Sequence, residues 1–245
     1  MIAALLLGRK GSQGFPGKNT SVVAGHPLAW YPMSTALNTP EVDRVFLSTD
    51  DPELMGIAST LGIETIERPA ALATSSALGD HAFAHGYEVI RKRYPEETIE
   101  VLVLLFCNAA TITSAAISRG IDILRTDSDA DSAVTVSRYN MWSPLRARRV
   151  DTDGYLLPFV PFETFGDPKT LNCDRDSQGD VFFADMGVSV IRPGNLDRLD
   201  DGLLPQRWMG KRIAPIVQTA GCDIDYEWQV AGVEWWIREY WDGEL

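Results

Sequence analysis

Residues 8–19, GRKGSQGFPGKN, combine the types of residue that can hold a polyphosphate. The glycines at positions 11, 14 and 17 can adopt positive φ and carry no Cβ, so that backbone N–H groups can close around phosphate oxygens. Arg9 offers a bidentate fork of donors and Lys18 a point charge. The spacing matches neither the GxGxxG pattern nor the Walker pattern, which ends in GKS or GKT. An ordinary turn between a strand and a helix, with lysines on its surface, is the alternative.

A pair of carboxylates near the other end of the chain is a second candidate for chemistry. Asp223 and Asp225 stand two residues apart in GCDIDYEW, and on an extended segment such residues point to the same face. Converging carboxylates suit Mg²⁺, which binds to one or two carboxylates together with substrate phosphates. In the alternative interpretation Asp225 caps the last helix and Asp223 is solvated.

Composition restricts the class of protein. The formal net charge is −12 over 245 residues, which argues against a general nucleic-acid binder, because such proteins carry a basic face. Three cysteines are scattered without paired spacing, as is typical of reduced intracellular thiols. The apolar run over residues 2–7 is too short to span a membrane. We therefore expect a cytoplasmic protein that binds neither nucleic acid nor membrane.

The order of the expected elements predicts an α/β fold with a three-layer, doubly wound and mostly parallel sheet. Asp51 followed by Pro52 predicts that a helix begins at residue 52. Such sheets bind ligands beyond the carboxyl ends of their strands, which is where residues 8–19 follow the first strand. Strands are expected at 2–7, 43–50, 63–66, 99–106, 131–139, 181–191 and 212–217, and further helices at 26–38, 79–93, 113–125 and 226–240.

The regular alternation stops between residues 140 and 180. This stretch carries several prolines, aromatic residues and a basic cluster of Arg146, Arg148 and Arg149. A long irregular segment within a compact domain is usually a lid or a contact with a partner. We expect one domain over residues 1–245, with 140–180 as an insert that serves as a lid or in dimerisation.

Several blocks of the sequence resemble the CMP-sialic acid synthetase family, the cytidylyltransferases that activate acidic nine-carbon sugars. Residues 8–19 are similar to the family's A-R-G-G-S-K-G-I-P-x-K-N, with Lys10 and Gln13 as departures. The matching positions are Arg9, Gly11, Ser12, Gly14, Pro16, Lys18 and Asn19. VFLSTDDPEL, ERPAALATSSALGD, DSAVTVSRY and GCDIDYEWQVAGVE resemble further family blocks and follow in the family's order.

Two blocks depart from the family's pattern. LLFCNAATIT stands where the family commonly has L-Q-P-T-S-P-L-R, so that Phe106, Asn108 and Ile112 replace glutamine, threonine and arginine. Asn108 is expected either to supply a replacement amide or to bond its own backbone. In FFADMGVSVI, Asp185 is expected to contact the sugar or metal, or to be a turn carboxylate.

The resemblance implies a Rossmann-like nucleotidyltransferase fold and a role for each matching residue. CTP would lie with its phosphates on the loop, bound by Gly11, Ser12, Gly14 and the cations Arg9 and Lys18. Asn19, Arg68 and Asn108 would contact the rest of the nucleotide, and Asp223 and Asp225 would hold Mg²⁺. Arg9, Lys18 and Asp225 are the expected catalytic residues.

The acceptor would be an acidic nine-carbon keto sugar, and the protein a homodimer. Arg175 or the arginines at 146, 148 and 149 would bind the carboxylate of the sugar, in part from the second subunit. Two alternatives remain. The chain is a nucleotidyltransferase for another sugar, such as a Kdo-like acid or a sugar phosphate, or it is a homologue that binds nucleotides without turnover.

Overall fold

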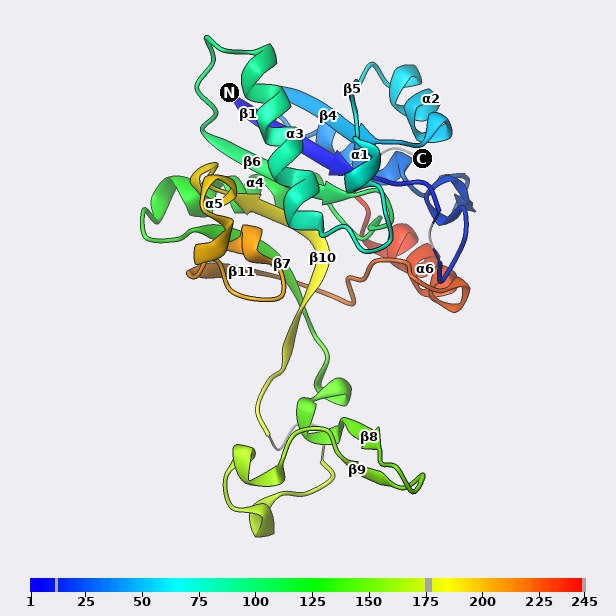
Figure 1. The fold of residues 1–245 in the computed structure, drawn as a ribbon, viewed down its shortest axis with the longest axis vertical. Coiled ribbons are helices and arrows are strands. Elements are labelled where there is room, and N and C mark those ends of the chain that lie inside the picture. Colours follow the sequence, from blue (N-terminus) through cyan, green and yellow to red (C-terminus); the bar gives the residue numbers. More distant parts are fainter. Residues whose placement is uncertain (12, 175–177, 244–245) are drawn as a thin grey trace.

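A seven-stranded sheet forms the body of the protein (Figure 1), as the sequence predicts. The computed structural model describes residues 1–11, 13–174 and 178–243. The strand order is β11-β7-β10-β6-β1-β4-β5, and neighbouring strands are parallel except β10, which is antiparallel to β6 and β7. The strands of this sheet are β1 (Ile2–Leu7), β4 (Arg44–Thr49), β5 (Glu64–Glu67), β6 (Val101–Phe106), β7 (Ser132–Arg138), β10 (Phe182–Ile191) and β11 (Ile213–Gln218).

Helices cover both faces of this sheet, which gives the three layers expected of an α/β fold. Alternate residues of β1 enter different cores, since Leu6 packs with residues of α1, α2 and α4, while Leu5 packs with residues of α3. Burial on both faces explains why β1 is a continuous apolar run. The helices are α1 (Trp30–Leu37), α2 (Pro52–Thr60), α3 (Gly79–Arg93), α4 (Ser114–Thr126), α5 (Gly194–Asp197) and α6 (Val230–Tyr240).

The first predicted helix is wrong over residues 26–29. A small hairpin of β2 (Val22–Val23) and β3 (His26–Pro27) occupies this stretch, and α1 begins only at Trp30. Ala24 and Gly25, with φ of 45° and 99°, make the turn, and an alanine at positive φ gives no signal in the sequence. Pro32 lies in the first turn of α1, where its missing N–H breaks no helical bond.

The other helix ends agree more closely with the expectation. The carboxylate of Asp51 accepts a hydrogen bond from the N–H of Glu53 at 3.0 Å, and Pro52 is the first residue of α2. The last helix, expected from residue 226, begins at Val230 after a short 3₁₀ turn over Glu227–Gln229. No helix in the described part of the chain is both long and apolar enough to span a membrane.

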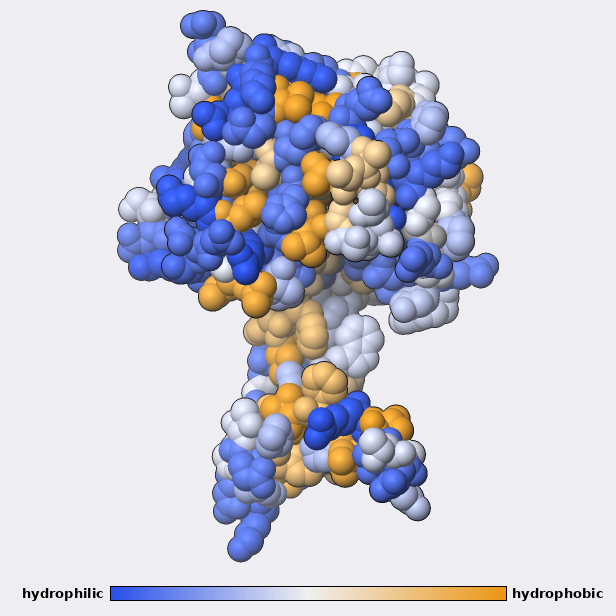
Figure 2. Space-filling model, viewed as in Figure 1, coloured by the Kyte–Doolittle hydropathy of each residue, from blue (hydrophilic) through white to orange (hydrophobic). Residues whose placement is uncertain are grey.

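The described residues between 140 and 180 form an arm that projects from the body on the ends of β7 and β10 (Figure 1). Its described residues form short 3₁₀ turns and a hairpin of β8 (Arg148–Val150) and β9 (Leu156–Pro158). Figure 2 shows hydrophobic surface on the arm and on the stalk, which is the part of β7 and β10 that joins the arm to the body. The exposed apolar side chains in this region include those of Trp142, Val150, Tyr155, Leu156, Phe159 and Phe183.

Candidate active site

A cavity of about 290 Å³ opens at the carboxyl ends of β1 and β6, as expected for a doubly wound sheet. It gathers side chains from the loop after β1, the segment after β5, the loop after β6 and the segment before α6. Of the predicted site residues, the cavity is lined by Arg9, Lys18, Asn19, Arg68, Asn108, Asp223 and Asp225. Gly11 and Gly14 lie in the adjoining loop, and Ser12 and Arg175 lie outside the described residues.

Close packing fixes the start of the glycine-rich loop. A Cβ on Gly8 would lie 2.4 Å from Leu54 and 2.7 Å from the sulfur of Cys107, so only glycine fits there. Burial raises the pKa of Cys107 to about 12, which makes this thiol a packing group and not a nucleophile. The carboxylate of Asp50 accepts a hydrogen bond from the backbone N–H of Lys10 at 2.9 Å and ties the loop to β4.

The glycines of the loop serve two different purposes. Gly11 and Gly17 have φ of 79° and 72°, as expected of a loop that bends its backbone around a ligand. Gly14 is not among the residues with positive φ. A Cβ there would lie 2.6 Å from the carbonyl oxygen of Asp225, so Gly14 allows the loop to approach the segment that carries the acidic pair.

Two arginines line the cavity without a counter-ion. Arg68 is only 6% exposed and donates to the hydroxyl and the carbonyl of Ser48, at 3.3 and 2.5 Å. Burial lowers the pKa of Arg68, and the charge of Arg9 acts in the same direction, whereas Cys107 and Asp50 act against it. Among the described residues, no carboxylate forms an ion pair with either arginine. Two guanidinium groups without an ion-pair partner among the described residues make the cavity suited to an anion.

Asn19 presents a free acceptor to the cavity. Its side-chain N–H group donates to the carbonyl of Arg9 at 3.5 Å, and its backbone carbonyl accepts from the N–H of Ala29 at 2.9 Å. The side-chain oxygen is buried and has no partner within the described residues. Because buried polar atoms are normally paired, this oxygen fits a ligand that offers an N–H or O–H group.

The acidic pair lines the same cavity and is held by Lys18 and Asn108. The ammonium of Lys18 lies 2.6 Å from Oδ1 of Asp225, and the amide of Asn108 donates to Oδ2 of Asp223 at 3.0 Å and to the carbonyl of Ile224 at 3.1 Å. Burial, and then the charge of Asp225, raise the pKa of Asp223, while Lys18 and Asn108 act against this. Asn108 thus bonds the acidic segment and not its own loop.

The helix-capping interpretation of Asp225 is wrong. The side-chain oxygen of Gln229 accepts from the N–H groups of both Asp225 and Tyr226, each at 2.7 Å, so Gln229 caps this end. The carboxylate of Asp225 is therefore free to pair with Lys18.

The donor set fits Mg²⁺ only together with a phosphate ligand. Within the described residues no group of three or more His, Cys, Asp or Glu side chains converges, whereas a site built by protein alone needs more ligands. Asp223 and Asp225 supply two hard oxygen donors, and burial, together with repulsion by Asp225, raises the pKa of Asp223. A divalent cation would relieve this repulsion, and phosphate oxygens would complete its coordination.

The far wall of the cavity is apolar, and most of it was not predicted. It consists of Leu72, Ala77, Leu78, Gly79, Ala82, Phe106 and Met186. The sequence block ERPAALATSSALGD contains several of these residues, but it predicts only Arg68 as a site residue. Met186 has φ of 60° at an irregularity in β10, between Ala184 and Ser189, which gives no signal in the sequence.

Two departures from the family's pattern lie away from the cavity. Asp185 is 5% exposed and bonds Ser137, Gln218 and the N–H of Gly187, so the expectation that it contacts the sugar or metal is wrong. Ile112 is buried in the core beneath α4.

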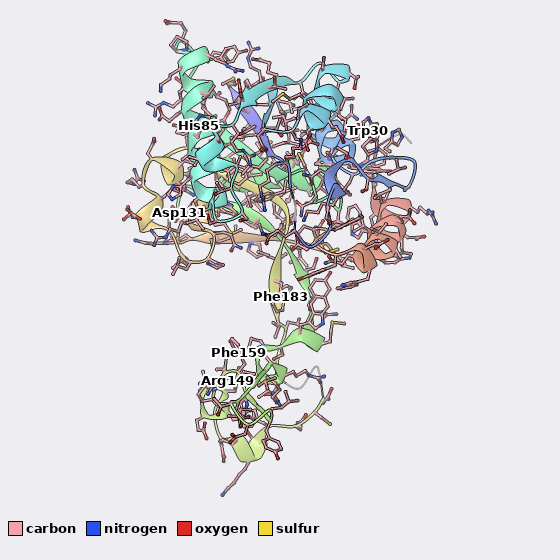
Figure 3. The ribbon with its side chains drawn as sticks, turned by 45° about the vertical axis from the view of Figure 1, so that its right-hand side comes forward. Trp30, His85, Asp131, Arg149, Phe159 and Phe183 are labelled. Carbon is pink, nitrogen blue, oxygen red and sulfur yellow. The ribbon has the colours of Figure 1, made fainter. Side chains whose placement is uncertain are left out.

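None of the three histidines lines the cavity, and His85 lies on α3 (Figure 3).

Comparison with known proteins bears on this fold and this site. A family model described as cytidylyltransferase matches residues 3–130, which is more than half of the chain. The chain belongs to the cytidylyltransferase family. This match and the relatives below confirm the resemblance to CMP-sialic acid synthetases that the motifs indicate.

Two curated relatives carry the name N-acylneuraminate cytidylyltransferase. The protein of Oncorhynchus mykiss is 37% identical over 76 residues, which are 31% of this chain and 18% of the relative. The protein of Escherichia coli O18:K1:H7 (strain RS218 / NMEC) is 30% identical over 88 residues, 36% of this chain and 21% of the relative. The matched stretch thus spans about a fifth of the length of these relatives.

Among solved structures, a CMP:2-keto-3-deoxy-manno-octonic acid synthetase complexed with CTP has a TM-score of 0.67. It is 15% identical, and the alignment covers 97% of this chain and 98% of the other. The cytidylyltransferase fold therefore extends beyond residues 3–130 and includes the arm and the acidic segment.

Proposed function

We propose that this member of the cytidylyltransferase family transfers CMP from CTP to an acidic keto sugar and releases pyrophosphate. The observation that carries the proposal is the set of charges that line one cavity. Arg9 and Arg68 form no ion pair within the described residues, and the Lys18–Asp225 pair and Asp223 line the same cavity. Three cations suit a triphosphate, and two carboxylates suit the divalent cation that accompanies it.

The charged residues of the cavity and Asn19 have the following roles in this reaction. Arg9, Arg68 and Lys18 neutralise phosphate oxygens and hold the α-phosphorus in line with the attacking hydroxyl. The side-chain oxygen of Asn19 accepts a hydrogen bond from the base or the ribose. Asp223 and Asp225 would hold Mg²⁺, which when bound neutralises charge on the triphosphate and lowers the pKa of a bound hydroxyl.

The proposed acceptor is an acidic nine-carbon sugar of the nonulosonate class. Phe106 and Met186 bring apolar surface to the cavity, which suits the acylamino or deoxy groups of such sugars better than rows of hydroxyls. A cation for the sugar's carboxylate is available on the arm, where Arg148 and Arg149 belong to β8. Figure 3 places Arg149 on the arm, away from the cavity of the same chain.

Pyrophosphate release from CTP and Mg²⁺ tests the activity, with nine-carbon keto acids and Kdo supplied one at a time. We expect turnover with a nine-carbon acid and a loss of at least about 100-fold in Lys18→Ala and Asp225→Asn, because each change removes transition-state charge stabilisation. Lys92→Ala, an exposed lysine on α3, is the matched control and should retain wild-type rates. Turnover with Kdo alone would show that the acceptor is a Kdo-like acid and not a nine-carbon sugar. An absence of CTP binding in calorimetry would contradict the function itself.

We also propose that the arm pairs two chains into a homodimer. Leu156 is 69% exposed on β9 and lies among other exposed apolar residues of the arm, and such patches usually mark an interface. Sedimentation should show a dimer for the wild type and a monomer for Leu156→Asp. Leu204→Asp changes a leucine that is 76% exposed outside the arm and should remain dimeric. A monomeric wild type at micromolar concentration would refute the pairing.

A further inference from the structure

The segment between β11 and α6, which carries Asp223 and Asp225, is anchored by a buried polar network. The hydroxyl of Ser137 on β7 accepts a hydrogen bond from the N–H of Gly221 at 2.8 Å. The same hydroxyl donates to Oδ2 of Asp185 on β10 at 2.7 Å. Ser137 is fully buried and Asp185 nearly so. The backbone two residues before Asp223 is thus held by two strands of the central sheet.

Gln218 and Thr111 hold the segment on either side of Gly221. The amide of Gln218 donates to Oδ2 of Asp185 at 2.9 Å and to the carbonyl of Thr111 at 3.0 Å. The hydroxyl of Thr111 accepts from the N–H of Cys222 and donates to its carbonyl, each at 2.9 Å. A Cβ on Gly221 would lie 2.4 Å from the carboxylate of Asp185, so the segment lies directly against this network.

The network also reaches the base of the arm. Tyr139, the residue after β7, donates its hydroxyl to the carbonyl of Gly221 at 2.9 Å. Its ring lies against Trp142, with centroids 4.6 Å apart, and near Phe183 at 6.3 Å. Figure 3 shows Phe183 on the stalk between the body and the arm. The backbone N–H and carbonyl of one residue, Gly221, are therefore bonded by Ser137 and Tyr139, which lie close to the root of the arm.

We propose that Ser137 and Asp185 are positioning residues that set the place of the acidic pair toward the metal, although neither touches the cavity. The inference rests on the proposed function, because it concerns the metal site of that reaction. Asp185 accepts three hydrogen bonds, from Ser137, Gln218 and Gly187. An uncharged amide at this position has only one acceptor oxygen, so even the isosteric Asp185→Asn must break part of the network.

The sequence offers a matched control for Ser137. Ser132 lies on the same strand, is equally buried, and donates its hydroxyl to the carbonyl of Met209 at 2.6 Å. Ser132→Ala and Ser137→Ala therefore delete the same group from one buried strand, with the loss of one hydrogen bond at Ser132 and of two at Ser137. Of these two serines, only Ser137 is bonded to the segment that carries Asp223. A difference between the two variants then reports positioning and not a general loss of stability.

The experiment measures how strongly Mg²⁺ tightens the binding of CTP. Calorimetric titration of CTP is carried out once with EDTA and once with saturating Mg²⁺, and the ratio of the two dissociation constants isolates the contribution of the metal. Loss of a group that orients a metal ligand typically costs about 10–100-fold in affinity. We expect Ser137→Ala and Asp185→Asn to reduce this ratio at least about tenfold, with CTP binding in EDTA unchanged. Ser132→Ala should keep the wild-type ratio.

Each outcome bears on the inference. A ratio within twofold of the wild type in Ser137→Ala, or an equal loss in Ser132→Ala, overturns the positioning role and leaves the proposed function intact. A wild type that binds CTP equally well with and without Mg²⁺ contradicts the metal site itself, and the inference falls with it. Circular dichroism of all variants at the titration temperature establishes that each is folded.

Discussion

Replacement of Gly14 by alanine tests the contact between the glycine-rich loop and the acidic segment. The new Cβ would lie 2.6 Å from the carbonyl oxygen of Asp225 and 3.4 Å from the ring of Tyr226. Backbone cannot swing away as a flexible side chain can, so the loop or the segment must move. The shortfall from an ordinary contact of about 3.4 Å is about 0.8 Å.

This displacement falls between the cations and the acids of the cavity. Lys18 and Asp225 form their 2.6 Å ion pair across the same junction, so a shift of this size separates groups that must act on one triphosphate. A misplacement of about 1 Å can cost about 100-fold in rate, and overpacking of this kind costs about 1–3 kcal/mol of stability. We expect kcat/KM to fall about 10–100-fold and Tm to fall by several degrees.

The assay is pyrophosphate release with the best acceptor, together with thermal unfolding of the same samples. Gly56→Ala is the matched control, because a Cβ on Gly56 within α2 meets nothing within 4 Å. This change should stabilise the protein by about 0.5–1 kcal/mol and leave the rate unchanged. Activity within twofold of the wild type in Gly14→Ala would refute the argument that this junction aligns the two halves of the site.

Three further predictions concern other parts of the cavity and its surroundings. Arg68→Met should weaken CTP binding about 10–100-fold in calorimetry, because a charge-assisted hydrogen bond contributes about 1.5–3 kcal/mol, and undiminished binding would place the anion elsewhere. Phe106→Gln should lower kcat/KM for the acceptor about tenfold without a change in the dissociation constant of CTP; an altered CTP affinity would place Phe106 against the nucleotide. Burial, and then the charges of Arg68 and Lys92, lower the pKa of His85. The unfolded chain therefore binds this proton more tightly, and stability is lost as pH falls from about 6.5 toward the lower folded pKa. Urea unfolding of His85→Gln should show a smaller loss in that window, and equal losses would contradict the assignment.

The sheet could be predicted because its signals are local. The run at β1 is apolar at every position, since both faces are covered, and Asp51 followed by Pro52 marks the start of α2. Pro27 favours a helix that includes residues 26–29, but the structure has a hairpin before α1 that turns at Ala24, which adopts positive φ. That conformation is imposed by the surrounding contacts and not by the residue type, so no sequence pattern predicts it.

Part of the candidate site follows from topology. Arg9 follows β1, Arg68 follows β5 and Asn108 follows β6, and the carboxyl ends of neighbouring parallel strands meet at one edge of a sheet. The ion pair of Lys18 with Asp225 joins residues 207 positions apart. Only the resemblance to a known family predicts that the glycine-rich loop and the acidic segment belong to one site. The apolar wall remained hidden because leucine and alanine before a helix are typical of cores as well as of ligand pockets.

The error at Asp185 shows what the sequence cannot supply. Neighbouring residues of a strand point to opposite faces, so at most one of Asp185 and Met186 could face the cavity. Residue type favours the polar side chain, but the backbone geometry decides, because β10 shifts its register between Ala184 and Ser189. Met186 consequently lines the cavity, while Asp185 turns to the network that holds Gly221. The same strand begins at Phe182 on the stalk of the arm. Within five residues β10 therefore lies at the root of the arm, against the segment of the acidic pair and in the wall of the cavity.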